Sequence, residues 1–199
     1  MNQRYGAWRR VVQPRRWAGL LGLALAWLVM LAPAAAAEPR TVLVMGDSLS
    51  AAYGLAPAQG WVSLTGERLA KDVPGWRIVN ASISGETTAG GASRIAAELK
   101  RHAPDVVVIE LGANDGLRGL GLEQSRANLD RMLVAAKGAG AKVLLLGMRI
   151  PPNYGTRYTE GFAANFSTLA DEHDVALLPF LLEPIATDRT AFQADNLHP

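Results

Sequence analysis

The chain has 199 residues, with 20 Lys and Arg against 18 Asp and Glu, 49% hydrophobic residues and no cysteine. This composition is typical of a globular protein and excludes disulfide scaffolds and thiolate sites. Five arginines and no acidic residue fall within residues 1–37, so the rest of the chain has 15 basic and 18 acidic residues, a net charge of −3 with histidine neutral. No nucleic-acid partner is expected for such an acidic domain.

Residues 1–37 have the pattern of a bacterial signal peptide. The arginines precede an apolar run from Trp17 to Leu31, which is followed by Pro33 and by four alanines that end at Ala37. A basic segment, an apolar segment and small residues at a cleavage site predict export, with cleavage near Ala37. The alternative is an uncleaved anchor, because no charge lies between Arg16 and Glu38. With cleavage, we expect a periplasmic or secreted protein without a stable membrane span.

Residues 38–199 are expected to form one α/β domain. The apolar runs are continuous and mostly β-branched, which is typical of strands buried on both faces of a parallel sheet. In chain order we expect a strand at 41–45, a helix at 61–71, a weaker strand at 77–79, a helix at 93–102, a strand at 105–111, a helix at 123–139, a strand at 142–148, a helix at 159–173 and a strand at 175–179. This alternation predicts a doubly wound sheet, in which ligands bind beyond the carboxyl ends of the strands.

Three segments that follow predicted strands carry polar residues suited to acyl transfer. Ser48 stands in the turn Gly46 to Ser50, directly after the first strand, and is expected at the start of a helix. Gly85 lies in the polar segment 80–87, and Asn114 lies in the turn 112–116. Each has an ordinary explanation, since serine caps helices, glycine permits positive φ, and Asn-Asp-Gly is common in turns.

The last residues of the chain supply an acid and a base. Asp195 precedes His198 by three residues, so its carboxylate can fold back and accept the Nδ1 proton, which leaves Nε2 free to deprotonate a serine. Taken together, the segments predict a serine esterase with Ser48 as nucleophile, His198 as base and then acid, and Asp195 as the group that fixes the tautomer. The Ser48 and Gly85 N–H groups and the Asn114 amide would surround the oxyanion.

These blocks resemble the GDSL, or SGNH, hydrolases. The resemblance rests on Gly46-Asp47-Ser48-Leu49, Gly85, the Gly-x-Asn-Asp of 112–115, and Asp195-x-x-His198-Pro199, and it covers nearly all of the exported part. Within the family, segments 80–85, 114–119, 149–154 and 178–180 are most similar to the periplasmic thioesterase, lysophospholipase and arylesterase group. The resemblance implies a flavodoxin-like three-layer α/β/α fold with a five-stranded parallel sheet. It implies hydrolysis of acyl thioesters, lysophospholipids and aryl esters through an acyl-enzyme, with no metal or cofactor.

The resemblance also implies a mobile substrate loop. This loop would line the acyl groove, and it consists of Asp115, Gly116, Leu117, Arg118, Gly119 and Leu120. Three departures from the family pattern stand out. Ala113 replaces a frequent glycine, Asn196 replaces another glycine and is expected in a conformation that asparagine permits, and relatives continue beyond the position of Pro199 into a final helix. We therefore expect a domain that lacks this last helix and is truncated at its C-terminus.

Other functions remain open at this point. A carbohydrate O-deacetylase of the same superfamily would be expected to have a more aromatic site, whereas only Trp61 and Trp76 follow the signal peptide. A non-catalytic ligand-binding module would have no reason to keep nucleophile, base and oxyanion donors together. An ordinary α/β-hydrolase would need a second glycine in place of Ser50. The run 171–174 looks like a metal cluster but is expected to be a solvated helix end, so no metal is predicted. We expect a monomer that acts on small ester or thioester substrates, with an envelope lysophospholipid favoured over acyl-CoA.

Overall fold

The computed structural model describes residues 39–199, so the predicted signal peptide lies outside the described residues. Its centre is a parallel sheet of five strands in the order β2-β1-β3-β4-β5. The strands are β1 (Arg40–Gly46), β2 (Trp76–Asn80), β3 (Val106–Glu110), β4 (Lys142–Leu146) and β5 (Ala176–Leu178). All five predicted strands are present, and the strand order is that of the flavodoxin-like fold.

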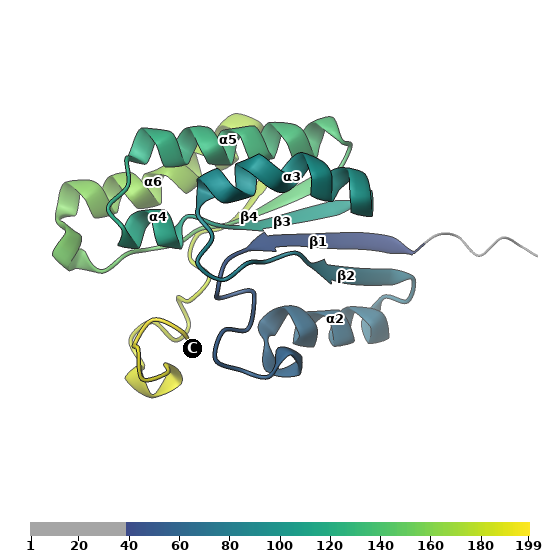
Figure 1. The fold of residues 1–199 in the computed structure, drawn as a ribbon, viewed down its shortest axis with the longest axis horizontal. Helices are drawn as coiled ribbons and strands as arrows, with labels where there is room; N and C mark the ends of the chain where they lie inside the picture. The colour runs from purple at the N-terminus through teal and green to yellow at the C-terminus, as the bar shows by residue number, and fades with distance from the viewer. Residues whose placement is uncertain (1–38) are drawn as a thin grey trace, which may run out of the picture. The chain divides into compact units, whose positions relative to one another are not determined.

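Helices cover both faces of the sheet, which gives the predicted three layers. The helices are α2 (Trp61–Asp72), α3 (Thr88–His102), α4 (Ala113–Leu117), α5 (Leu122–Gly138) and α6 (Thr156–His173), with short 3-10 turns at Pro57–Gln59, Pro152–Tyr154 and Arg189–Ala191. Figure 1 shows α3, α4, α5 and α6 on one face and α2 on the other. The yellow C-terminal segment lies on the side of α2, at the end of the sheet to which β1 points.

Burial on both faces explains why the strand sequences are continuously apolar. Along β3, Val107 and Ile109 pack into the main core with α3, α5 and α6, whereas Val108 packs on the opposite face with Val62 of α2. Val107 and Ile109 are completely buried and Val108 is nearly so. Both sides of such a strand must therefore be hydrophobic, as the sequence pattern indicated.

Two differences from the sequence-based expectation have a clear local cause. Helix α3 begins at Thr88 rather than at residue 93, because the Thr87 side chain accepts a hydrogen bond from the Gly90 N–H and caps the helix ahead of its glycines. The expected helix after Ser48 is absent, and residues 48–54 form turns instead. Ala52 has a φ of 58°, in the left-handed region, which interrupts the helical path.

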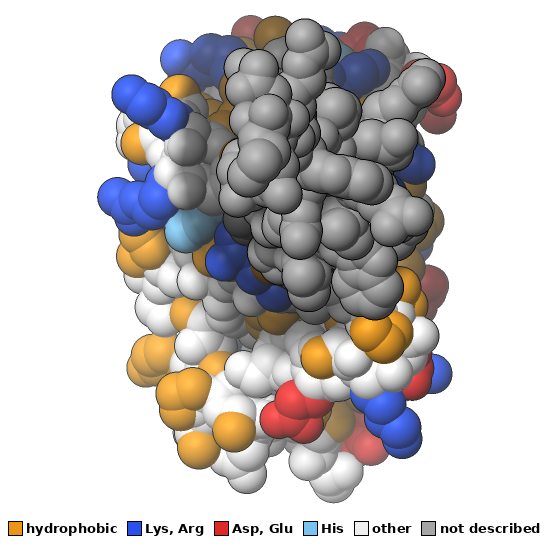
Figure 2. Space-filling model, turned by 90° about the vertical axis from the view of Figure 1, so that its right-hand side faces the viewer, with side chains coloured by type: hydrophobic (Ala, Val, Ile, Leu, Met, Phe, Trp, Pro, Cys, Tyr) orange, Lys and Arg blue, Asp and Glu red, His pale blue; other side chains and the backbone are white. Residues whose placement is uncertain are grey.

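The positive charge on the face at the amino ends of the strands has a simple structural explanation. Figure 2 views this face and shows Lys and Arg side chains gathered in its upper part. The last turns of α3 and α5 end in Lys100, Arg101 and Lys137, where cations complement the helix dipoles. Within residues 39–199, the helices are too short or too polar to cross a lipid bilayer.

Candidate active site

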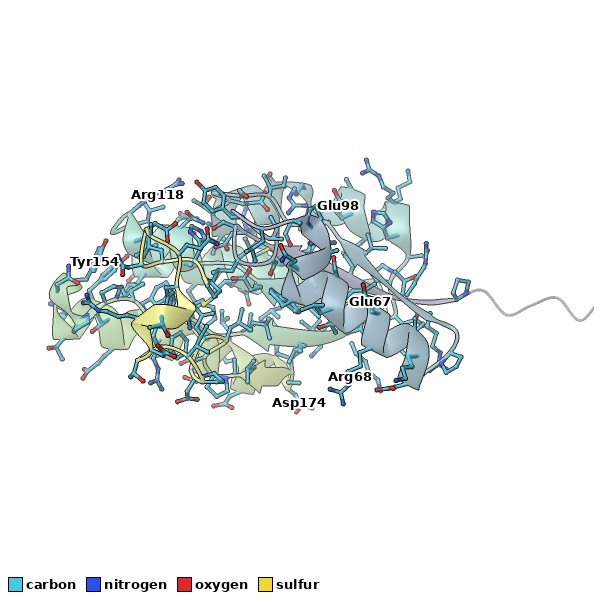
Figure 3. The ribbon with its side chains drawn as sticks, turned by 90° about the horizontal axis from the view of Figure 1, so that it is seen from below. Glu67, Arg68, Glu98, Arg118, Tyr154 and Asp174 are labelled. Carbon is cyan, nitrogen blue, oxygen red and sulfur yellow. The ribbon has the colours of Figure 1, made fainter. Side chains whose placement is uncertain are left out.

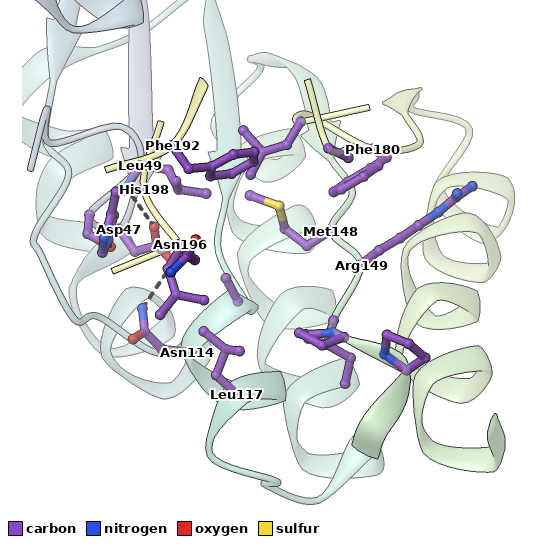
Figure 4. A pocket seen from close by; sticks show the side chains of 18 of the residues that line it. Asp47, Leu49, Asn114, Leu117, Met148, Arg149, Phe180, Phe192, Asn196 and His198 are labelled. Carbon is purple, nitrogen blue, oxygen red and sulfur yellow. Dashed lines mark hydrogen bonds between the residues drawn. The ribbon is translucent and has the colours of Figure 1, made fainter. Parts of the chain in front are cut away.

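The predicted site residues come together at the carboxyl ends of the central strands. Strands β1 and β3 are neighbours, and the chain turns from β1 toward β2 on one side and from β3 toward β4 on the other. Ser48 follows β1 and Asn114 follows β3, so both lie where the strand order reverses, the usual ligand position of an open α/β sheet. The C-terminal segment returns to the same place and brings His198 beside Ser48 (Figure 4).

Ser48, His198 and Asp195 form a continuous hydrogen-bonded chain. The Nε2 atom of His198 lies 2.8 Å from the Ser48 Oγ, and its Nδ1 atom lies 2.7 Å from the Asp195 Oδ2. The other carboxylate oxygen, Oδ1, accepts the N–H groups of Leu197 at 2.9 Å and His198 at 3.0 Å. Asp195 thus folds back within one turn, which leaves Nε2 directed at the serine.

The surroundings of His198 fix its ring and keep its partner ionised. The ring centroid of Tyr53 lies 4.5 Å from that of His198, and the His198 side chain is only 17% exposed. The backbone N–H of Leu197 and the His198 side chain lower the pKa of Asp195 to about 2. Asn196 has a φ of 56°, the left-handed conformation that asparagine tolerates, so its replacement of glycine leaves the turn intact.

Two backbone donors near Ser48 are available to an oxyanion. No acceptor among the described residues pairs with the N–H of Ser48 or Gly85. Gly85 has a φ of 79°, a conformation that side chains rarely adopt. The Arg118 guanidinium donates to the Gly85 carbonyl at 3.0 Å and so holds this peptide. Figure 3 shows Arg118 and Tyr154 at the end of the molecule where the C-terminal segment lies.

Asn114 lies beside Ser48 with its amide already engaged. Its Nδ2 atom donates to the Asp47 Oδ2 at 3.1 Å and to the Glu86 carbonyl at 3.0 Å. Both N–H bonds of the amide therefore have acceptors in this state. An oxyanion would have to share or replace one of these acceptors, and sequence reasoning did not anticipate this.

The segment expected to be the substrate loop is in part a helix. Residues 113–117 form α4, and of the six predicted substrate-binding residues only Leu117 lines the pocket beside Ser48. Asp115 is buried because its carboxylate accepts hydrogen bonds from Thr88 N, Thr88 Oγ1 and Ser125 Oγ. The hydroxyl of Tyr154 donates to the Leu117 carbonyl at 2.7 Å. The Asp115 carboxylate is therefore held within the fold. Contact of substrate with Gly116, Arg118, Gly119 and Leu120 stays a prediction, and most of the pocket lining comes from other segments.

Those segments enclose a mostly apolar pocket of about 570 Å³. Leu117 contributes from α4, Met148 and Ile150 follow β4, and Phe180 and Phe192 come from the C-terminal part of the chain (Figure 4). Ser48 and His198 lie at one side of the pocket. The Arg149 guanidinium stacks 5.4 Å from the centroid of the Phe180 ring. A pocket of this size and chemistry fits an acyl chain.

Two acidic residues at the site were missed from the sequence. Asp47 and Glu110 are both completely buried at the ends of β1 and β3. Burial raises the pKa of Asp47 to about 6, against an ordinary value of 3.8, and it raises the pKa of Glu110 well above its usual range. The signal was Glu110 itself, an acid within a run that was predicted to be buried on both faces.

The raised pKa of Asp47 predicts how an Asp47→Asn variant will respond to pH. Between about pH 3.8 and 6 the folded protein keeps a proton that the unfolded chain has released, so the free energy of unfolding of the parent falls as the pH rises through this window. Asparagine does not titrate. From pH 3.5 to pH 7.5 the variant should therefore gain stability relative to the parent, by at most about 3 kcal/mol.

Urea unfolding at both pH values measures this difference. The effect of hydrogen bonds that the substitution changes equally at both pH values cancels when the two stability differences are subtracted. An Asp72→Asn variant on the exposed surface serves as the control. A stability difference that stays constant with pH would contradict the raised pKa.

The run 171–174, which was expected to be a solvated helix end, takes part in surface contacts. The His173 Nε2 atom lies 2.7 Å from the Asp130 Oδ1, and Arg126 pairs with Glu172. Within residues 39–199, the structure brings together no group of three or more side chains that could hold a metal ion.

Comparison with known proteins identifies the family. The model of the GDSL-like Lipase/Acylhydrolase family matches residues 44–199. The chain is 51% identical to Esterase TesA of Pseudomonas aeruginosa over 86% of its own length and 85% of the relative. It is 43% identical to the Escherichia coli protein named thioesterase 1/protease 1/lysophospholipase L1, over 82% of this chain and 77% of that one. A crystal structure of TesA superposes with a TM-score of 0.78 and covers 80% of this chain and 89% of the other. The chain therefore belongs to the GDSL-like lipase and acylhydrolase family of ester-hydrolysing enzymes.

Proposed function

We propose that this enzyme hydrolyses acyl esters and thioesters through Ser48, His198 and Asp195 by way of an acyl-enzyme. The observation that carries the proposal is the relay from the Asp195 Oδ2 through His198 to the Ser48 Oγ, with contacts of 2.7 and 2.8 Å, at the side of an apolar pocket. A nucleophile, a base and an orienting carboxylate in hydrogen-bond contact are the requirements of this chemistry.

In the first half of the reaction, His198 Nε2 takes the Ser48 proton as Oγ attacks the carbonyl carbon. The carbonyl oxygen becomes an anion that the Ser48 and Gly85 N–H groups and the Asn114 amide stabilise. The intermediate collapses as the bond to the alcohol or thiol breaks, and His198 gives its proton to that leaving group. In the second half, His198 takes a proton from a water molecule as that water attacks the acyl-serine. The bond between the acyl carbon and the Ser48 Oγ then breaks, His198 returns the proton to Oγ, and the carboxylic acid leaves. Asp195 stays ionised throughout and stabilises the imidazolium.

The substrate assignment rests on the pocket and on the relatives. Aryl esters, acyl thioesters and lysophospholipids share an acyl chain, which the apolar wall of Leu117, Met148 and Phe180 would hold. The names of the relatives cover esterase, thioesterase and lysophospholipase activities. We further propose that residues 1–37 direct export as a cleaved signal peptide, that the enzyme acts as a monomer, and that an envelope lysophospholipid is a substrate after export.

Fluorophosphonate labelling tests the proposal directly. The reagent should phosphonylate the Ser48 Oγ with loss of fluoride, and mass spectrometry of the digested protein should locate the adduct. Modification of another serine, or no modification of a folded protein that hydrolyses esters, would overturn the assignment.

The pocket predicts how activity depends on acyl length. Phe180→Ala removes an aromatic wall, so each added methylene of the substrate is buried less completely. Its contribution to binding should therefore be less than the roughly 0.8 kcal/mol of full burial. With p-nitrophenyl esters from two to sixteen carbons, log(kcat/KM) should rise less steeply with chain length in the variant. The acetyl ester should be the least affected, because its acyl group has no added methylene to bury.

Leu178→Ala is the matched control, since Leu178 is 41% exposed and lies outside the pocket lining. It should keep the chain-length dependence of the parent. Equal slopes for all three proteins would show that the acyl chain binds elsewhere.

A further inference from the structure

Glu110 lies beneath the turn that carries Ser48. It is the last residue of β3, is completely buried, and is paired in register with Gly46, the last residue of β1. Its Oε2 atom accepts hydrogen bonds from the Ser50 hydroxyl at 2.7 Å and from the Asp47 N–H at 3.2 Å. The carboxyl thus binds the chain one residue before and two residues after Ser48.

The fit between this carboxyl and the turn is close. A Cβ atom at Gly46 would lie 2.7 Å from the Glu110 Oε2 and 2.6 Å from the Ser50 Cβ, so only glycine leaves room for these contacts. The glycine of the Gly-Asp-Ser-Leu block is therefore required for space and not for a positive φ. It allows a carboxyl group from the neighbouring strand to reach the turn.

Burial of Glu110 favours the protonated form of its carboxyl group. Burial is the larger cause, and the neighbouring Asp47 carboxylate adds to it, so the pKa of Glu110 stands well above its usual range. No donor among the described residues reaches the Glu110 Oε1, which would leave an ionised carboxylate half unpaired. An unpaired buried charge is far more costly than a neutral carboxyl group.

We propose that Glu110 is a positioning residue of this esterase, a buried carboxyl group that holds the turn around Ser48 in the conformation that the reaction needs. The inference rests on the proposed role of Ser48 as nucleophile. Glu110 also acts indirectly on Asn114. It accepts a hydrogen bond from the Asp47 N–H, and the Asp47 carboxylate accepts a hydrogen bond from the Asn114 amide at 3.1 Å. One group thereby ties the nucleophile turn to the oxyanion side of the site.

Removing this contact should affect turnover more than substrate binding. Ser48 must keep both its Oγ within reach of His198 and its N–H directed at the oxyanion, and a displacement near 1 Å can cost about 100-fold in rate. Apart from residues 47–49, the acyl pocket is formed by other segments, so ground-state binding should change little.

The test compares Glu110→Leu and Glu110→Gln with a matched control. Leucine leaves the Ser50 hydroxyl and the Asp47 N–H without an acceptor, and kcat should fall about 100-fold with KM nearly unchanged. Glutamine mimics a neutral carboxyl group and keeps an acceptor oxygen, so kcat should stay within about fivefold of the parent, the equivalent of one ordinary hydrogen bond. Val108→Ala, two residues earlier on the same face of β3, should lower the melting temperature without lowering kcat.

Kinetics and fluorophosphonate labelling rates are measured well below each melting temperature. If the parent is not labelled at Ser48, the proposed function itself fails. If the parent is labelled and Glu110→Leu keeps its kcat, or if Glu110→Gln is as slow as Glu110→Leu, the role of Glu110 is overturned.

A second variant covers the case in which Glu110→Leu does not fold. Ser50→Ala removes one of the two contacts and leaves Glu110 in place, and it should lower kcat about tenfold, as the loss of a buried hydrogen bond would. An unchanged kcat in Ser50→Ala would also overturn the proposal.

Discussion

Ser48→Ala is expected to reduce kcat for a p-nitrophenyl ester by about 10⁴- to 10⁶-fold while the protein stays folded. The Ser48 Oγ is the only atom of the site that would form the covalent bond to the acyl group, and no methyl group can replace it. The hydroxyl contacts the His198 Nε2 and lies on a turn outside the core, so its loss removes no packing. The residual rate should come from the oxyanion donors and substrate binding alone.

Two measurements check this result together. The melting temperature should remain close to that of the parent, and fluorophosphonate labelling should disappear with the activity. Ser93→Ala is a suitable control, because the Ser93 hydroxyl is exposed on α3 and, within residues 39–199, bonds only to the Gly90 carbonyl. Labelling that persists in Ser48→Ala would assign the nucleophile to another residue.

Much of this fold could be predicted because the three central strands are buried on both faces. The continuous runs that became β1, β3 and β4 could not lie at a solvated surface, and alternation with helices left a doubly wound sheet as the simplest arrangement. The site could be located for the same reason, since Ser48 and Asn114 follow strands that the fold places side by side. The short spacing between Asp195 and His198 predicted their contact without any tertiary information.

The remaining features depend on contacts between distant segments, which no local pattern specifies. Glu110 meets the turn around Ser48 only because β3 pairs with β1 in one register. Asp115 was expected at the substrate, but its carboxylate satisfies donors of Thr88 and Ser125, which come from α3 and α5. The left-handed Ala52 that prevents a helix after Ser48 likewise has no sequence signature, because alanine is a strong helix former.

Asn114→Ala is expected to lower kcat by about 10²- to 10³-fold and to leave KM nearly unchanged. A donor that meets charge only in the transition state stabilises that state without stabilising bound substrate. In the free protein the Asn114 Nδ2 donates to the Asp47 Oδ2 and to the Glu86 carbonyl. The amide is therefore held in place before substrate arrives, and the oxyanion competes for one of its hydrogens.

The Asp47 carboxylate gives Asn114→Ala a further consequence. Without the amide, Asp47 loses one of the hydrogen bonds that lower its pKa, so that pKa should rise further.

Leu117→Ala provides the contrast, because it shortens an apolar wall of the pocket and should raise KM for long-chain esters more than it lowers kcat. Steady-state kinetics of both variants with acetyl and long-chain p-nitrophenyl esters separate the two effects. If Asn114→Ala instead raised KM and kept the kcat of the parent, Asn114 would be a residue that anchors the substrate rather than a donor to the oxyanion.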